Sequence, residues 1–85
     1  MKEVRWSPVK SRRLKRTRGV SFEEIIEARL IDVMKHPNRD DQRVMLFLHK
    51  NYIWLVPFVE RDNTIFLKTL YPSRKFTKMI FRRRE

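Results

Sequence analysis

The only glycine in the chain, Gly19, lies between a strongly basic segment, Lys10 to Arg18, and an amphipathic segment that begins at Ser21. Ahead of the basic segment, Ser7 and Pro8 have the pattern of a helix N-cap followed by proline at the first helical position, where its missing N–H costs nothing. Glycine readily takes the left-handed conformation that ends a helix. The sequence therefore predicts a helix from about Pro8 to Arg18.

A second helix-start signal follows directly after this glycine. In the stretch Ser21-Phe22-Glu23-Glu24, the Ser21 hydroxyl can accept from the N–H of Glu24 while the Glu24 carboxylate reaches back to the N–H of Ser21. Apolar residues then recur at helical spacing as far as Met34. This pattern predicts a second helix that ends before His36-Pro37.

The remainder of the chain is rich in β-branched and aromatic residues. Three segments, "RVMLFLH", "YIWLVPFVE" and "TIFLKTLY", are separated by the short turn-like stretches "KN" and "RDN". They predict three successive strands in an antiparallel meander. Since Pro57 has no N–H to donate, we expect the middle strand to have an open side or a bulge at that position.

The two ends of the chain add one element each. "VRW" near the start is a candidate short strand, and Phe76, Met79 and Ile80 recur at helical spacing after Pro72-Ser73. We therefore predict an α+β fold: a short N-terminal strand, two helices packed on a three-stranded antiparallel meander, and a short C-terminal helix. A chain of 85 residues supports one hydrophobic core, so we expect a single domain over residues 1–85.

The charge of the chain predicts a polyanionic partner. Lys plus Arg number 21 against 10 Asp plus Glu, a net charge of +11, which points to RNA, DNA, an anionic membrane surface or an acidic protein. The absence of cysteine excludes disulfides and thiolate catalysis. No apolar run approaches the roughly 18 residues needed to span a bilayer, and the start has no apolar signal core, so we expect a cytoplasmic protein outside the membrane.

Basic residues fall in two groups that could bind phosphate. Like charges three or four residues apart repel on a helix, so the first helix either has a solvated face or binds an anion. Its charges are Lys10, Arg12, Arg13, Lys15, Arg16 and Arg18. The second group, Lys68, Arg74 and Lys75 around Tyr71, could hold and stabilise a reacting phosphate, or could serve only to keep a sheet edge soluble.

The two histidines have no partner at metal or triad spacing. His36 lies in a turn beside Pro37, and His49 lies at a strand end, which is typical of structural roles, although His49 could act as a general acid or base. We predict neither a metal site nor a cofactor.

Several stretches together resemble one known family. They are "WSPVK" at the first helix, "RGVSFEE" at the helix junction, "VPFVE" in the middle strand and "IFLKTLYPSRK" before the tail. The chain resembles the BrnT family of type II toxins, within the RelE/ParE superfamily. The resemblance implies a RelE/ParE-like fold and an endoribonuclease that arrests translation without a metal, by attack of the ribose 2′-OH on the adjacent phosphate. It also implies a hetero-oligomer with an acidic antitoxin that carries a ribbon-helix-helix DNA-binding domain.

The resemblance also implies residue roles. Lys10 and Arg74 match the family's basic catalytic residues, and Lys68 and Tyr71 are further catalytic candidates. The predicted RNA-binding residues are Arg12, Lys15, Arg18, Arg43 and Lys75. Thr17-Arg18-Gly19 stands where typical members have Lys-His-Gly, so a lysine or Tyr71 would have to transfer the proton. Two other hypotheses remain open: a non-catalytic RNA- or ribosome-binding module, and a gyrase poison of the kind found in the same superfamily.

Overall fold

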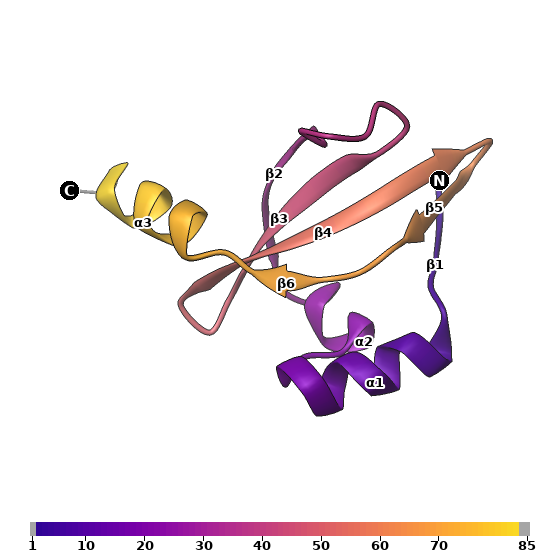
Figure 1. The fold of residues 1–85 in the computed structure, drawn as a ribbon, viewed down its shortest axis with the longest axis horizontal. Helices are drawn as coiled ribbons and strands as arrows, with labels where there is room; N and C mark the ends of the chain where they lie inside the picture. Colours follow the sequence, from indigo (N-terminus) through magenta and orange to yellow (C-terminus); the bar gives the residue numbers. More distant parts are fainter. Residues whose placement is uncertain (1, 84–85) are drawn as a thin grey trace.

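The computed structural model describes residues 2–83, and the predicted α+β class is confirmed. The described residues form six strands and three helices (Figure 1). In chain order these are β1 (Glu3–Arg5), α1 (Pro8–Arg18), α2 (Phe22–Ile25), β2 (Arg29–Lys35), β3 (Arg43–His49), β4 (Tyr52–Arg61), β5 (Thr64–Leu67), β6 (Tyr71–Pro72) and α3 (Arg74–Arg83).

All six strands belong to one mixed sheet. Its order is β1-β5-β4-β3-β2, with β6 also paired to β4. The pairs β2–β3, β3–β4 and β4–β5 are antiparallel, whereas β1 pairs with β5 in parallel. The turn between β3 and β4 is formed by Lys50 and Asn51, both with positive φ, which matches the right-handed twist of a two-residue hairpin. The N-terminal strand and the first two strands of the predicted meander are thus confirmed, within a larger sheet than three strands.

The first helix begins and ends where the sequence predicts. The Ser7 hydroxyl accepts from the N–H of Lys10 at 3.2 Å, and Gly19 has φ +82° while its N–H donates to the Lys15 carbonyl at 3.1 Å. Leu14 is buried against the sheet, and the second buried side chain of the helix is Ser11, which is only 1% exposed. These two lie three residues apart and so share one face of the helix.

The predicted second helix is wrong beyond its first turn. α2 ends at Ile25, and Arg29–Lys35 is strand β2, paired with β3. The register of β2 shifts at Ile31, so that Ile31 and Met34 pack on one face of the sheet and Val33 on the other. A β-bulge therefore interrupts the strand alternation and leaves apolar residues three apart, the same spacing that a helix would give.

The third predicted strand is divided into β5 and β6. Phe58 of β4 pairs with Leu67. Leu55, three residues before Phe58, pairs with Tyr71, which is four residues after Leu67. One extra residue therefore lies opposite β4, which is a β-bulge. It occurs opposite Pro57, whose carbonyl accepts from the N–H of Lys68 at 2.9 Å. Of the two alternatives expected at this proline, an open side or a bulge, the structure has a bulge, and its extra residue lies in the segment opposite β4.

Helices pack on both faces of the sheet (Figure 1). On one face α1 and α2 cover a cluster that includes Phe22, Ile25, Trp54, Val56 and Phe58. On the other face α3 covers a smaller cluster. This second cluster contains Val44, Leu46, Ile53 and Leu55, with Tyr71, Phe76 and Ile80 packed against it. Because α3 packs at the Ile53 end of β4, no helix within the described residues covers the other end of that face.

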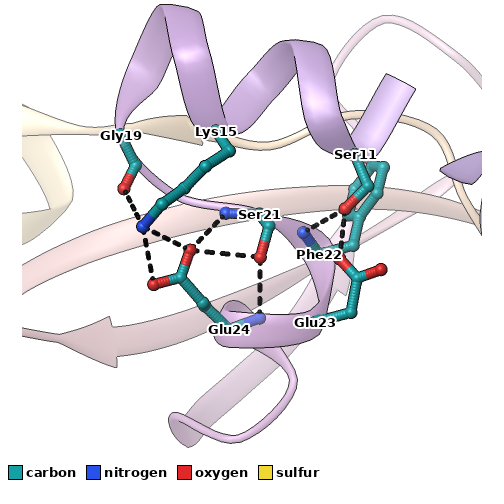
Figure 2. A network of polar contacts seen from close by, with 7 residues as sticks. All are labelled: Ser11, Lys15, Gly19, Ser21, Phe22, Glu23 and Glu24. Atoms are coloured by element: carbon teal, nitrogen blue, oxygen red, sulfur yellow. Dashed lines mark hydrogen bonds and ion pairs between the residues drawn. The ribbon is translucent and has the colours of Figure 1, made fainter. Parts of the chain in front are cut away.

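The junction of α1 and α2 is stabilised by the predicted capping box (Figure 2). The Ser21 hydroxyl accepts from the N–H of Glu24 at 3.1 Å, and the Glu24 carboxylate accepts from the N–H of Ser21 at 3.0 Å. The ammonium of Lys15 lies 2.8 Å from the same carboxylate and also donates to the Gly19 carbonyl at 3.3 Å. These contacts lower the pKa of Glu24 to about 2, mainly through the Lys15 hydrogen bond and the Ser21 N–H.

The lowered pKa of Glu24 predicts how the stability of the fold depends on pH. The contribution of Glu24 is complete above its ordinary pKa of 4.5 and is lost as pH falls through about 2. We expect Glu24→Gln to have a shallower loss of unfolding free energy than the wild type between these two pH values. Urea denaturation of both proteins at several pH values would measure this, and parallel curves would contradict it.

Candidate functional site

The part of the sheet that lacks a helix forms one wall of an open cavity of about 610 Å³. Pro57 and Val59 of β4 provide its apolar floor. The other walls of the cavity come from three segments: the start of α1, the loop between β2 and β3, and the connection between β5 and β6. The side chains from these three segments are Lys10, His36, Arg39, Asp41, Gln42, Lys68, Thr69 and Tyr71, together with Arg61 at the end of β4.

Three of the four predicted catalytic residues meet in this cavity. Lys10 comes from the first turn of α1, Lys68 from the bulged segment opposite Pro57, and Tyr71 from the start of β6. The fourth, Arg74, is the first residue of α3, where it is exposed and does not line the cavity. The structure thus brings together Lys10, Lys68 and Tyr71 and leaves Arg74 outside the group.

The electrostatic environment of Lys10 destabilises its charged form relative to that of an ordinary lysine. Partial burial lowers the pKa of this ammonium, and the positive charges of Arg13, Lys68 and Arg18 lower it further. Lys68 is more exposed, and its ammonium lies 5.6 Å from the centre of the Phe66 ring, which attracts a cation. Lys10 therefore gives up its proton more readily than an ordinary lysine does.

The loop between β2 and β3 supplies cavity residues that the sequence did not predict. The N–H of His36 donates to the Gln42 carbonyl at 3.2 Å, and its Nδ1 accepts from the N–H of Asn38 at 3.1 Å. The neutral ring therefore has its proton on Nε2. His36 does support a turn, as the sequence predicts, but it also lines the cavity beside Arg39. Because the sequence predicted a helix up to this point, it gave no reason to place the loop beside Lys10.

The other histidine does not join this group. His49 is two residues from Phe47 in β3 and so lies on the same face of the sheet as Phe47, which packs under α1 and α2 and is opposite to Pro57. It is also at the far end of β3 from the β2–β3 loop. Its Nε2 is buried without a hydrogen-bond partner among residues 2–83. The hypothesis of His49 as a general acid or base therefore has no support from its position in the fold.

Two of the five predicted RNA-binding residues have structural contacts instead. Lys15 pairs with Glu24, and the guanidinium of Arg18 donates to the Leu70 carbonyl, which fixes the end of α1 to the β5–β6 connection. Arg12 on α1 and Lys75 on α3 are exposed.

The fifth predicted RNA-binding residue, Arg43, lines a second cavity. Its guanidinium lies 3.8 Å from the Glu60 carboxylate and 5.9 Å from the centre of the Phe58 ring. The five residues therefore do not form one surface.

No group of three or more His, Asp or Glu side chains within residues 2–83 is arranged to hold a metal ion. In the same part of the chain no helix is both long enough and apolar enough to cross a membrane. Comparisons of the chain with protein-family models, with curated proteins and with solved structures gave no significant match.

Proposed function

We propose that this protein is a metal-independent endoribonuclease of the type II toxin class, with a RelE/ParE-like fold and its catalytic centre in the cavity that contains Lys10. One observation carries the proposal. Lys10, Lys68 and Tyr71 were selected from the sequence as catalytic candidates, lie in separate elements, and line the same basic cavity. The resemblance of the sequence to the BrnT toxins supplies the reaction, and the cavity supplies groups that suit it.

The proposed reaction begins with proton transfer to Lys10. In its neutral form, which its lowered pKa favours, the Lys10 amine accepts the proton of a ribose 2′-OH. The 2′-oxygen then attacks the adjacent phosphorus. Negative charge develops on the phosphoryl oxygens, and the ammonium of Lys68 and the guanidinium of Arg61 offset it.

The reaction ends with departure of the 5′-oxygen. The Tyr71 hydroxyl donates its proton to this oxygen as the P–O bond breaks, which leaves a 2′,3′-cyclic phosphate on one fragment and a 5′-OH on the other. Water then restores the protonation of Lys10 and Tyr71. His36, with its proton on Nε2, can donate a hydrogen bond to a phosphoryl oxygen throughout.

The toxin class also accounts for the outer surface of α1. Arg12, Arg13 and Arg16 are exposed, and none forms an ion pair within the region that the structure describes. An acidic antitoxin with a ribbon-helix-helix DNA-binding domain would bind such a surface in a hetero-oligomer. The cytoplasm is where both this partner and translated RNA occur.

Incubation of purified protein with a defined single-stranded RNA in EDTA tests the proposal. We expect fragments that end in 2′,3′-cyclic phosphate and 5′-OH, and a cleavage rate lowered by about 10²-fold in Tyr71→Phe, which keeps the ring but cannot donate a proton. Lys78→Met, an exposed change on α3, is the matched control and should cleave normally.

Other outcomes would contradict the proposal. RNA that is bound but stays intact, both alone and in a translating extract, would identify a non-catalytic binding module. Inhibition of DNA supercoiling with intact RNA would identify a gyrase poison. Cleavage that continues unchanged in Tyr71→Phe would remove this residue from the mechanism.

A further inference from the structure

A second cavity of about 580 Å³ adjoins the first at the loop between β2 and β3. His36, Arg39 and Gln42 line both cavities, so the two share a wall. The second cavity adds Lys35, the last residue of β2, and Arg43, the first of β3. The two concave surfaces are therefore neighbours on either side of one loop.

The second cavity is basic in its own right. Lys35, Arg39 and Arg43 contribute three positive charges, and among residues 2–83 Asp40 is the one carboxylate on its wall. All three basic residues are exposed. The Glu60 carboxylate, 3.8 Å from Arg43, is too distant for a close hydrogen-bonded ion pair. An anion that enters this cavity meets an excess of positive charge.

The arrangement of charge fits a ligand that carries anionic groups at intervals. Each cavity lies in the range of roughly 300–1,000 Å³ that holds small ligands, and each has its own cations. A single phosphate or mononucleotide would occupy one cavity and leave the cations of the other unused. A single-stranded nucleic acid has one phosphate per nucleotide and enough backbone flexibility to follow a bend around a loop.

We propose that the second cavity binds the phosphodiester backbone of nucleotides that flank the cleaved bond, so that the substrate is a single strand several nucleotides long. This inference rests on the proposed function, because it takes the cavity with Lys10 as the position of the cleaved bond. Arg39, which lines both cavities, lies between the two subsites. Lys35 and Arg43 contact only the flanking nucleotides.

Binding of RNA that cannot be cleaved tests this inference separately from the chemistry. The probes are 2′-O-methyl oligonucleotides from two to eight nucleotides in length, and the measurement is the dissociation constant of the full chain over a range of salt concentrations. We expect affinity to rise at least tenfold between the dinucleotide and the octanucleotide. In Lys35→Gln and Arg43→Gln, the logarithmic salt slope for the octanucleotide should fall by about 0.7 per substitution.

The dinucleotide provides the internal comparison. Its affinity should be unchanged in Lys35→Gln and Arg43→Gln, and both affinities should be unchanged in the control Lys78→Gln. Thermal unfolding of each variant checks that it is folded. Equal losses for short and long oligonucleotides, or an affinity that does not depend on length, would overturn the second subsite.

The two proposals fail in different ways. Binding that depends on length and on Lys35 would support the second subsite even if no RNA were cleaved, and the ribonuclease proposal alone would then fail. Cleavage that occurs with the same rate constant on a dinucleotide and an octanucleotide, with no effect of Lys35→Gln on binding, would leave the ribonuclease and remove the subsite.

Discussion

Replacing Lys10 by methionine is expected to lower the rate of RNA cleavage by about 10²–10⁴-fold, the usual range for loss of a general base. Methionine has nearly the same length and lacks the amine, so the packing of the first turn of α1 should change little. The Ser7 cap, which bonds to the main chain of this residue, remains available. Single-turnover cleavage in EDTA measures the effect, with Lys78→Met as the control.

Lys10→Arg separates proton transfer from charge. Arginine keeps the positive charge but stays protonated at every accessible pH, so it can hold a phosphate and cannot accept a proton. We expect RNA affinity close to that of the wild type and a cleavage rate close to that of Lys10→Met. Full activity in Lys10→Arg would show that Lys10 acts only as a charge.

The pH dependence of the same variants provides a second readout. Cleavage needs neutral Lys10, so the rate should increase with pH until this group has lost its proton, and the lowered pKa moves that increase below the range of an ordinary lysine. The increase should be absent in Lys10→Arg. If the wild type and Lys10→Arg had the same pH profile, the general base would be another group in the cavity. His36 and Asp41 are the candidates there.

Ser11→Ala is expected to destabilise the fold by about 1–3 kcal/mol, which is large for the removal of one oxygen atom. The Ser11 hydroxyl is 1% exposed, accepts from the N–H of Phe22 at 3.0 Å and donates to the Glu23 carboxylate (Figure 2). Glu23 also accepts from the indole N–H of Trp6 at 3.2 Å. Alanine would leave the first N–H of α2 without its partner inside the protein.

Thermal and urea denaturation measure this loss. In a domain of this size each kcal/mol corresponds to about 4–8 °C in Tm. Ser7→Ala provides the comparison, because it removes the half-buried cap of the same helix and should cost about 1 kcal/mol. A Ser11→Ala protein as stable as the wild type would mean that water or a small movement of α2 satisfies the Phe22 N–H.

Local signals in the sequence were sufficient for α1, for the capping box and for the hairpin of β3 and β4. Each of these depends on residues close together in the chain, such as a hydroxyl and an N–H three positions apart. The bulge opposite Pro57 was one of the two alternatives that the sequence indicated, because a missing N–H is a property of one residue. Two of the cavity's basic residues, Lys10 and Lys68, could be selected because each belongs to one of the two basic groups in the sequence, although Lys68 lies in the bulged segment between β5 and β6 rather than in a strand.

β2 could not be predicted, and this error hid part of the site. Its apolar residues repeat every three positions because a bulge interrupts the alternation, and a bulge is stabilised by pairing with β3 rather than by the residues themselves. Once Arg29–Lys35 is a strand, the loop that follows lies at the edge of the sheet beside Lys10. His36 and Arg39 therefore became candidates only with the tertiary structure.

The extra residue between β5 and β6 decides which side of the sheet Tyr71 faces. In the structure Tyr71 pairs with Leu55 and lies on the same face as Pro57. If the pairing of Phe58 with Leu67 continued without the bulge, Tyr71 would be opposite Trp54 and would point under α1 and α2. The Tyr71 hydroxyl is proposed to protonate the leaving oxygen. The number of residues between Leu67 and Tyr71 thus decides which face of the sheet this hydroxyl lies on, independently of what the Tyr71 ring packs against. Among relatives of this chain, the length of the segment from Leu67 to Tyr71 would then be constrained more tightly than its composition.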